Sequence, residues 1–230
     1  MAKIKYGPLV GSMSGSIGAT TFSQNRYGTY VRRRAIPTRS TTSYAMAAKA
    51  RLSAVSSLWS ELTEAQRIAW RVWAGNNPIT DRLGDRQVLT GHAAYVGINS
   101  GLSAAAETLL DVPPLGEAPA ALESASLVAD IGAGGFVLTF AATPLGATER
   151  LEVNACVVST DSVNYVSNYL RQIMFSPAAQ ATGMDFETEL EARLGALQVG
   201  QWIHCFLAVF DNATGLRSQP IRLRVAVTST

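Results

Sequence analysis

Four acidic residues alternate with other residues near the C-terminal end of the chain: Asp185, Glu187, Glu189 and Glu191. If residues 184–192 form a strand, this alternation places all four carboxylates on one face of a sheet. Such a face most simply contacts solvent, with Phe186 and Leu190 pointing inward. Two alternatives stay open. Paired carboxylates bind calcium or act as acid and base, and an acidic face can receive a basic segment of a neighbouring subunit.

Other reactive side chains are few. Cys156 and Cys205 are far apart in the sequence, and with only His92 and His204 beside them they show no spacing typical of a metal site. We expect both cysteines to be buried thiols, with a disulfide between them as the alternative, and both histidines to be packed side chains. The sequence therefore predicts no enzyme, no metal and no cofactor.

The charges are divided unequally along the chain. Residues 1–60 contain nine lysines and arginines and no acid, whereas the remaining 170 residues contain ten basic and 17 acidic residues. A net charge of +9 is thus joined to one of −7, although the whole chain carries only +2. No run of 18 apolar residues predicts a membrane span, and no apolar segment of a signal peptide follows Lys3 and Lys5, so we expect synthesis in the cytoplasm and no membrane partner.

Residues 1–40 are predicted to form a basic arm. A β-hairpin is expected from residues 20–23 and 29–32, with Asn25 and Gly28 in the turn, and Phe22, Tyr30 and Ile17 are expected to share one face. The glycine-rich stretch from residue 7 to 18 is expected to be extended and irregular. An arm this poor in apolar residues buries little surface when it becomes ordered, so it needs a partner.

The arm carries the candidate docking residues. These are Phe22, Arg26, Tyr30, Arg32, Arg33, Arg34 and Arg39. Three interpretations stay open: docking on an acidic protein surface, charges that only face solvent, and binding of nucleic acid with the aromatic rings as stacking platforms. The segment Gly15-Ser16-Ile17-Gly18 resembles a phosphate loop only superficially, because it lacks the Gly-Lys-Ser/Thr sequence and a hairpin follows it.

Residues 41–118 are predicted to form a small helical domain. The first helix starts at Thr42 or Ser43, the capping box Thr63-Glu64-Ala65-Gln66 starts the second, and the third begins near Thr90. Trp59, Trp70 and Trp73 fall on helical faces that turn toward one core, although an aromatic ligand cage is the alternative. A proline-rich linker over residues 112–119 follows.

Residues 119–230 change to the alternating period of strands. About seven strands in this length are typical of an immunoglobulin-like sandwich. The predicted strands are residues 136–140, 151–155, 202–210 and 221–227, with further candidates at 123–129, 166–174 and 184–192. The fold class is therefore α+β multidomain, with an N-terminal β-arm, a helical domain and a C-terminal all-β sandwich.

The order of short motifs resembles small structural proteins encoded by bacteriophages and prophages. The motifs are Ser14-Gly15-Ser16-Ile17-Gly18, Phe22, Arg26-Tyr27-Gly28, Tyr30-Val31-Arg32, Trp59, Leu62-Thr63, Gln66-Arg67 and Trp70, followed by Leu89-Thr90-Gly91, Tyr95 and Asn99. Separately, residues 120–228 resemble a fibronectin type III or immunoglobulin-like module. The resemblance to the phage structural proteins covers about residues 10–105 and brings no site residues with it.

The resemblance implies a virion structural protein, such as a capsid decoration, neck or tail component. The expected partners are other virion proteins and copies of the chain itself. Two other functions stay open: a receptor-binding adaptor that contacts the host through loops such as Asn212 to Arg217, and a neck component that binds nucleic acid.

Overall fold

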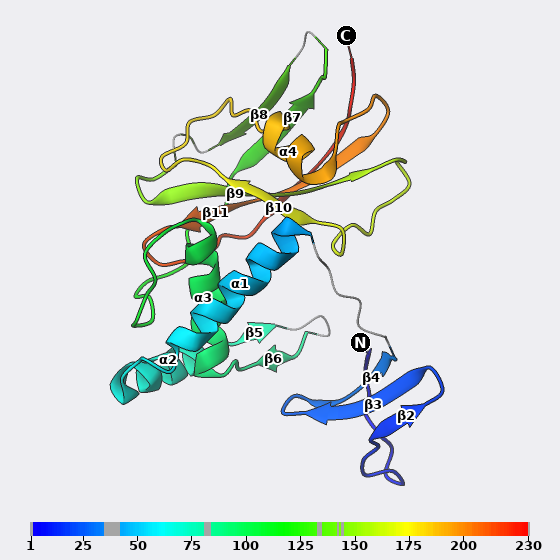
Figure 1. The fold of residues 1–230 in the computed structure, drawn as a ribbon, viewed down its shortest axis with the longest axis vertical. Helices are drawn as coiled ribbons and strands as arrows, with labels where there is room; N and C mark the ends of the chain where they lie inside the picture. Colours follow the sequence, from blue (N-terminus) through cyan, green and yellow to red (C-terminus); the bar gives the residue numbers. More distant parts are fainter. Residues whose placement is uncertain are drawn as a thin grey trace.

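The chain has a mixed α+β fold, as the sequence predicts. The computed structural model describes residues 2–34, 42–80, 84–132, 135–141, 143 and 145–229. Figure 1 shows a small sheet near the N-terminus, a group of helices, and a larger β-rich part that contains the C-terminus. The sheets are antiparallel, and the four helices of the described residues are α1 (Ser43–Leu58), α2 (Glu64–Asn76), α3 (Gly91–Ala104) and α4 (Glu187–Leu194).

The N-terminal arm forms a four-stranded sheet with the order β1-β4-β3-β2. Its strands are β1 (Ala2–Lys3), β2 (Gly15–Ile17), β3 (Thr20–Asn25) and β4 (Gly28–Arg33). The predicted hairpin is confirmed as β3–β4. In its turn the Asn25 side chain accepts a hydrogen bond of 2.9 Å from the Tyr27 N–H, and Gly28 has a φ of 110°. The stretch predicted to be irregular supplies β2, and no described residue from 3 to 34 is buried.

The predicted sharing of one face by Phe22, Ile17 and Tyr30 is wrong in part. Phe22 lies opposite Val31, and Tyr30 lies opposite Ser23. Since neighbouring residues of a strand point to opposite faces, Tyr30 points away from the face that carries Phe22 and Ile17. Phe22 and Tyr30 therefore lie on opposite faces of the arm sheet.

The helix starts follow the predicted caps. The Thr42 hydroxyl accepts the Ala45 N–H, the Thr90 hydroxyl accepts the Ala93 N–H, and a complete capping box links Thr63 and Gln66. Each cap satisfies an amide that the helix itself leaves without a partner. A short hairpin that the sequence did not predict, β5 (Ile79–Thr80) with β6 (Arg86–Gln87), lies between α2 and α3.

The tryptophans belong to the helical core, as predicted. Trp70 is fully buried, and its ring packs edge-to-face on Tyr95 with 5.5 Å between ring centroids. Its indole N–H donates to the Asp111 carbonyl at 2.9 Å, which satisfies the one polar group of this buried ring. Trp59 and Trp73 are half-buried against the same cluster.

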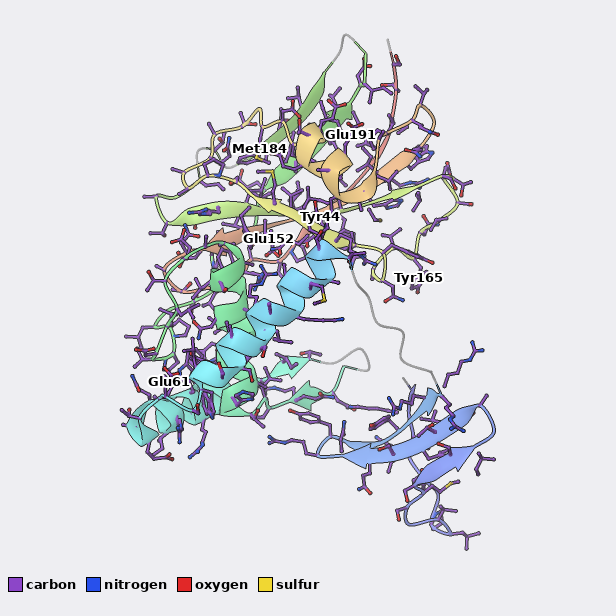
Figure 2. All side chains as sticks on the ribbon, viewed as in Figure 1. Tyr44, Glu61, Glu152, Tyr165, Met184 and Glu191 are labelled. Carbon is purple, nitrogen blue, oxygen red and sulfur yellow. The ribbon has the colours of Figure 1, made fainter. Side chains whose placement is uncertain are left out.

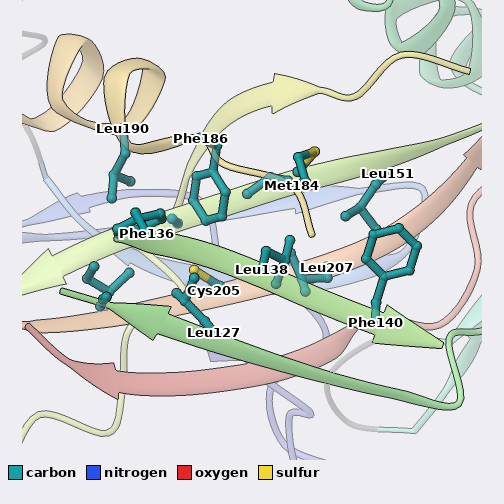
Figure 3. Close-up of a cluster of buried hydrophobic side chains, with 14 of the residues drawn as sticks. Leu127, Phe136, Leu138, Phe140, Leu151, Met184, Phe186, Leu190, Cys205 and Leu207 are labelled. Carbon is teal, nitrogen blue, oxygen red and sulfur yellow. The ribbon is translucent and has the colours of Figure 1, made fainter. Parts of the chain in front are cut away.

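The C-terminal part has two layers around one core. The first layer is the sheet β10-β9-β11-β12. The second layer is formed by the hairpin β7–β8 and helix α4, which cover one face of that sheet (Figure 1). The strands are β7 (Ser124–Ala129), β8 (Phe136–Ala141), β9 (Glu149–Val158), β10 (Arg171–Phe175), β11 (Trp202–Asp211) and β12 (Ile221–Ala226). Figure 3 shows the buried side chains between these layers, among them Phe136, Phe186 and Leu207.

Residues 184–192 do not form the predicted strand. Met184 makes one bridge to Leu138, and helix α4 then begins at Glu187. Phe186 and Leu190 are both fully buried, and a spacing of four residues puts them on one helical face. The helix is also stabilised by charges that interact favourably with its dipole, namely Glu187 and Glu189 in the first turn and Arg193 in the last turn. The candidate strand 166–174 shortens to β10.

The helices pack tightly on the β-rich part. Phe210 of β11 is fully buried in the helical core. A Cβ added to Gly215, in the loop after β11, would lie 2.7 Å from Ile98 on α3. Ion pairs between Arg217 and Glu152 and between Arg150 and Glu107 lie close to this contact. The loop from residue 212 to 217, which the sequence offered for host binding, therefore packs against α3.

The two cysteines are free and buried, as expected. They lie on neighbouring strands, and Cys205 pairs with Ala155 rather than with Cys156. Within the part of the chain that the structure describes, no helix has the length and apolar character needed to cross a membrane.

Candidate docking site at the N-terminal arm

The arm presents its arginines on both faces of a small sheet. Arg32 lies opposite Thr21 and Arg33 lies opposite Thr20, so their side chains point to opposite faces. The Arg34 N–H donates to the Ala19 carbonyl at 2.7 Å, which extends the pairing by one residue. All three arginines are exposed. Because they make no ion pair with the described residues, their charges are available to a partner.

Arg26 extends this basic surface to the hairpin turn. Its guanidinium carbon lies 5.4 Å from the centroid of the Tyr27 ring. Arg26 is exposed, whereas Phe22, Tyr30 and Val31 are half-buried. The structure thus brings six of the seven predicted docking residues together on one small sheet, and Arg39 lies outside the described residues.

Few contacts join the arm to the rest of the chain. The Tyr27 hydroxyl donates to the Val88 carbonyl at 3.1 Å, and the Lys3 ammonium lies 3.7 Å from an Asp85 carboxylate oxygen. Both contacts are polar and exposed, so each contributes about 1 kcal/mol or less. The sequence analysis did not find these contacts, because nothing local relates positions that are 61 residues apart, as Tyr27 and Val88 are, or still further apart, as Lys3 and Asp85 are.

Two cavities lie at this joint. The larger, of about 820 Å³, lies between the first strand and the β3–β4 turn and also touches Asp85. The second, of about 460 Å³, lies between Arg26 and the helices. Because well-packed protein interiors leave few voids larger than a water molecule, the arm is set against the helices without a packed interface.

Comparisons with models of known protein families, with curated proteins and with solved structures find no match to this chain. The function must therefore be argued from the residues and their arrangement.

The predicted acidic receiver is the surface of a helix rather than one face of a strand. Asp185 accepts the Glu187 N–H at 2.9 Å, and Glu191 accepts the Leu197 N–H at 2.8 Å, so both stabilise the local fold. The carboxylates of Glu187 and Glu189 make no hydrogen bond or ion pair with the described residues. Partial burial raises the pKa of Glu187, and the nearby Glu191 and Asp185 raise it further. Glu191 marks this helix in Figure 2.

The alternative of a calcium or acid–base site depended on a strand that would place the four carboxylates on one face, and this strand is not formed. On a helix, residues two apart do not face each other, so Glu189 is turned away from Glu187 and Glu191 and the four carboxylates do not share one face. Among the residues with described positions, no group of three or more His, Cys, Asp or Glu side chains could hold a metal ion. The segment Gly15-Ser16-Ile17-Gly18 is part of an edge strand, and another strand follows it.

Of the two histidines expected to be packed, His204 is buried, whereas His92 is exposed and contacts its neighbours from the surface. His92 Nε2 lies 3.2 Å from the Ser56 hydroxyl, and its ring contacts Trp59 edge-to-face. His204 is buried opposite Cys156, and its Nε2 atom has no hydrogen-bond partner. Burial lowers the pKa of His204, with a further contribution from Arg224, and burial raises the pKa of Cys156. Both groups therefore favour their neutral forms, which does not fit a thiolate–imidazolium pair.

Proposed function

We propose that this chain is a structural component of a bacteriophage particle that attaches to neighbouring subunits through its basic N-terminal arm. The observation that carries the proposal is the arm itself: a four-stranded sheet whose described residues 3–34 include no buried residue. A sheet without a core is marginal in water. A second surface that covers either face supplies the missing burial.

The arm offers both backbone and side chains to such a partner. Strand β2 is at the edge of the sheet, so its outer backbone groups are open to pairing with a strand of another chain. Phe22 and Val31 lie opposite each other and are half-buried, so a docked surface would cover them on one face. The gain from this burial offsets the entropy lost when the arm is fixed.

The arginines of the arm set the orientation of the contact. A guanidinium presents a planar set of donors that suits carboxylates. The body of the chain, with its net charge of −7 beyond residue 60, carries the complementary charge. Rim charges of this kind steer association and fix the register more than they raise affinity.

The C-terminal part is proposed to be the displayed module. Two layers of antiparallel strands around a single core support an immunoglobulin-like assignment for residues 119–230, with α4 in the place of one expected strand. The proposal gives this module no catalytic role and no cofactor. It places the protein in the virion, after synthesis in the host cytoplasm.

Removal of the arm tests the proposal. The full chain and a variant that lacks residues 1–40 are produced in cells that assemble the particles, and purified particles are analysed by mass spectrometry. We expect the full chain in the particles and the truncated chain in the lysate only. Retention of the truncated chain at the same level, or absence of the full chain from purified particles, would overturn the proposal.

A receptor-binding adaptor is the second candidate. Tyr165 and Tyr169, in the loop between β9 and β10, are 94% and 60% exposed, and Figure 2 labels Tyr165. Exposed aromatic side chains are enriched at binding surfaces. Under this alternative, Tyr165→Ala and Tyr169→Ala together abolish adsorption to host cells and leave incorporation into particles unchanged.

Binding of nucleic acid by the arm is the third candidate. Its cluster of arginines would contact phosphates, and the affinity for duplex DNA would then fall steeply as salt rises. A shallow salt dependence argues against this function.

A further inference from the structure

The cavity between the arm and the helices is lined by basic side chains. Its volume is about 460 Å³, and Arg26, Arg71 and His92 contribute to its wall together with Trp59 and Leu89. Arg26 comes from the β3–β4 turn, Arg71 from α2 and His92 from α3. The basic arm and the helical part thus build one site between them.

The charges in this cavity fit a carboxylate. Arg26 makes no ion pair with the described residues. Arg71 is 57% exposed and bonds to Glu64 at 2.9 Å through one of its nitrogens, so its other donors remain. The Thr90 hydroxyl already caps α3 by accepting the Ala93 N–H, and the cationic side chains rather than the helix end therefore define the site.

Helix α4 carries carboxylates that suit this cavity and have no cation of their own. Glu187 and Glu189 make no ion pair with the described residues. Glu189 is exposed and Glu187 is half-buried. The mutual repulsion of Glu187, Glu191 and Asp185 falls when a cation approaches, so contact with a basic site stabilises the ionised helix.

The carboxylates of α4 cannot reach the cavity of the same molecule, because helix α1 separates the two. At its start, Tyr44 donates from its hydroxyl to the Ala192 carbonyl of α4 at 3.2 Å and stacks on the Arg193 guanidinium at 3.6 Å. At its other end, Trp59 lines the cavity. Fifteen residues of helix span about 22 Å, and Figure 1 shows α4 and the arm at opposite ends of the molecule.

We propose that the cavity of one molecule binds Glu187 of a second copy of the chain. The cationic site and the acidic helix are different surfaces, so the contact is head-to-tail. A contact of this kind leaves one cavity and one acidic helix open at the two ends of every pair, and it continues into a ring or a filament. This inference rests on the proposed function, in which the arm attaches to neighbouring subunits.

Charge reversal on each side tests the contact in the full-length chain. Sedimentation velocity at low and high salt measures the self-association of the wild type, of Arg26→Glu and of Glu187→Lys. We expect the wild type to associate at low salt. Each variant is expected to associate more weakly by about tenfold or by a larger factor. Combining both substitutions in one chain restores part of the association, because the reversed charge at position 26 then meets the reversed charge at position 187.

A mixture of the two reversed variants tests the head-to-tail geometry. In the mixture an intact cavity of one variant meets an intact acidic helix of the other, so we expect association to recover, whereas each variant alone remains monomeric. Glu117→Lys is the matched control, since it makes the same change of charge at an exposed site outside α4. Arg222→Glu is the matched control for Arg26→Glu.

The same experiments give the results that overturn the inference. A monomeric wild type at low salt, an equal loss of association in the control variants, or no recovery in the combined variant would each exclude the contact. If a monomeric wild type binds duplex DNA and Arg26→Glu loses this binding, the cavity binds phosphates instead of carboxylates. In each case, arm-dependent incorporation into particles still decides the proposed function on its own.

Discussion

The arm and the C-terminal part are both built from antiparallel strands, yet only one of them has a core. In the C-terminal part, one face of the sheet is covered by β7–β8 and α4, and Phe136, Leu138 and Leu207 are almost completely buried. The arm sheet has no second layer, and its Ile17 and Leu9 are 68% and 97% exposed. Strand pairing alone therefore does not make a stable unit; a covering layer does.

The comparison predicts very different costs for the same substitution in the two sheets. Phe136→Ala removes a ring that is 2% exposed and packs edge-to-face on Phe186 at 4.9 Å. We expect a loss of about 3–5 kcal/mol in the free energy of unfolding. Phe22→Ala in the arm costs about 1 kcal/mol or less. Urea unfolding of both variants measures the difference, and equal losses would show that the arm folds as part of the core.

The helix–sheet contact sharpens the comparison, because it is the packed joint that the arm lacks. Gly215→Ala places a Cβ 2.7 Å from Ile98 at a residue whose φ is 69°. Gly200→Ala, at a φ of 85° with no atom within 4 Å, is the control that carries only the backbone strain. We expect Gly215→Ala to lower the free energy of unfolding by about 1–3 kcal/mol more than Gly200→Ala. Similar losses in the two variants would mean that the contact between α3 and the loop after β11 adjusts to the added Cβ.

A smaller effect is expected from the other face of the larger sheet, where His204 is buried beside Arg224. Burial, and then Arg224, lowers the pKa of His204 in the folded chain. The unfolded chain therefore binds a proton first as the pH falls, and stability is lost below the unfolded pKa of about 6.5. Urea unfolding between about pH 7 and pH 5 measures this loss.

Two variants assign that pH dependence. In His204→Phe the slope of stability against pH becomes flatter, because the titrating group is gone. His92→Gln, at the other histidine, is the control and retains the slope. A slope that disappears in His92→Gln and stays in His204→Phe would contradict the assignment.

Signals within short segments predicted most of the secondary structure. The capping box at Thr63, the cap at Thr90 and the hairpin around Gly28 each depend on residues a few positions apart, and all three are found. Residues 184–192 failed because their pattern fits two structures. Phe186 and Leu190 share a face in a strand and also in a helix, so periodicity alone does not decide between them.

Contacts between distant segments were beyond the sequence. The predicted docking arginines do gather on one sheet, because the hairpin brings them together. The joint between Tyr27 and Val88 and the placement of His204 opposite Cys156 depend on how whole elements pack and on strand register. No spacing of residue types indicates either one. The cationic cavity was missed for the same reason, since its three basic residues come from three elements.

The smallest predicted effect concerns the joint itself. Tyr27→Phe removes the hydroxyl that donates to the Val88 carbonyl at 3.1 Å, which costs about 1 kcal/mol or less. We expect faster hydrogen exchange at the amides around the Val88 contact and unchanged exchange within β3–β4, whose own pairing is intact. The overall free energy of unfolding stays the same.

Tyr30→Phe is the matched control, because the Tyr30 hydroxyl makes no hydrogen bond with the described residues. If Tyr27→Phe also speeds exchange throughout β3–β4, this one hydrogen bond holds the arm sheet in its folded form. If it lowers the overall stability, the arm belongs to the cooperative core. An effect limited to the joint leaves an arm sheet that folds by its own pairing and stays open to a partner, because a single exposed hydrogen bond sets its position on the helices.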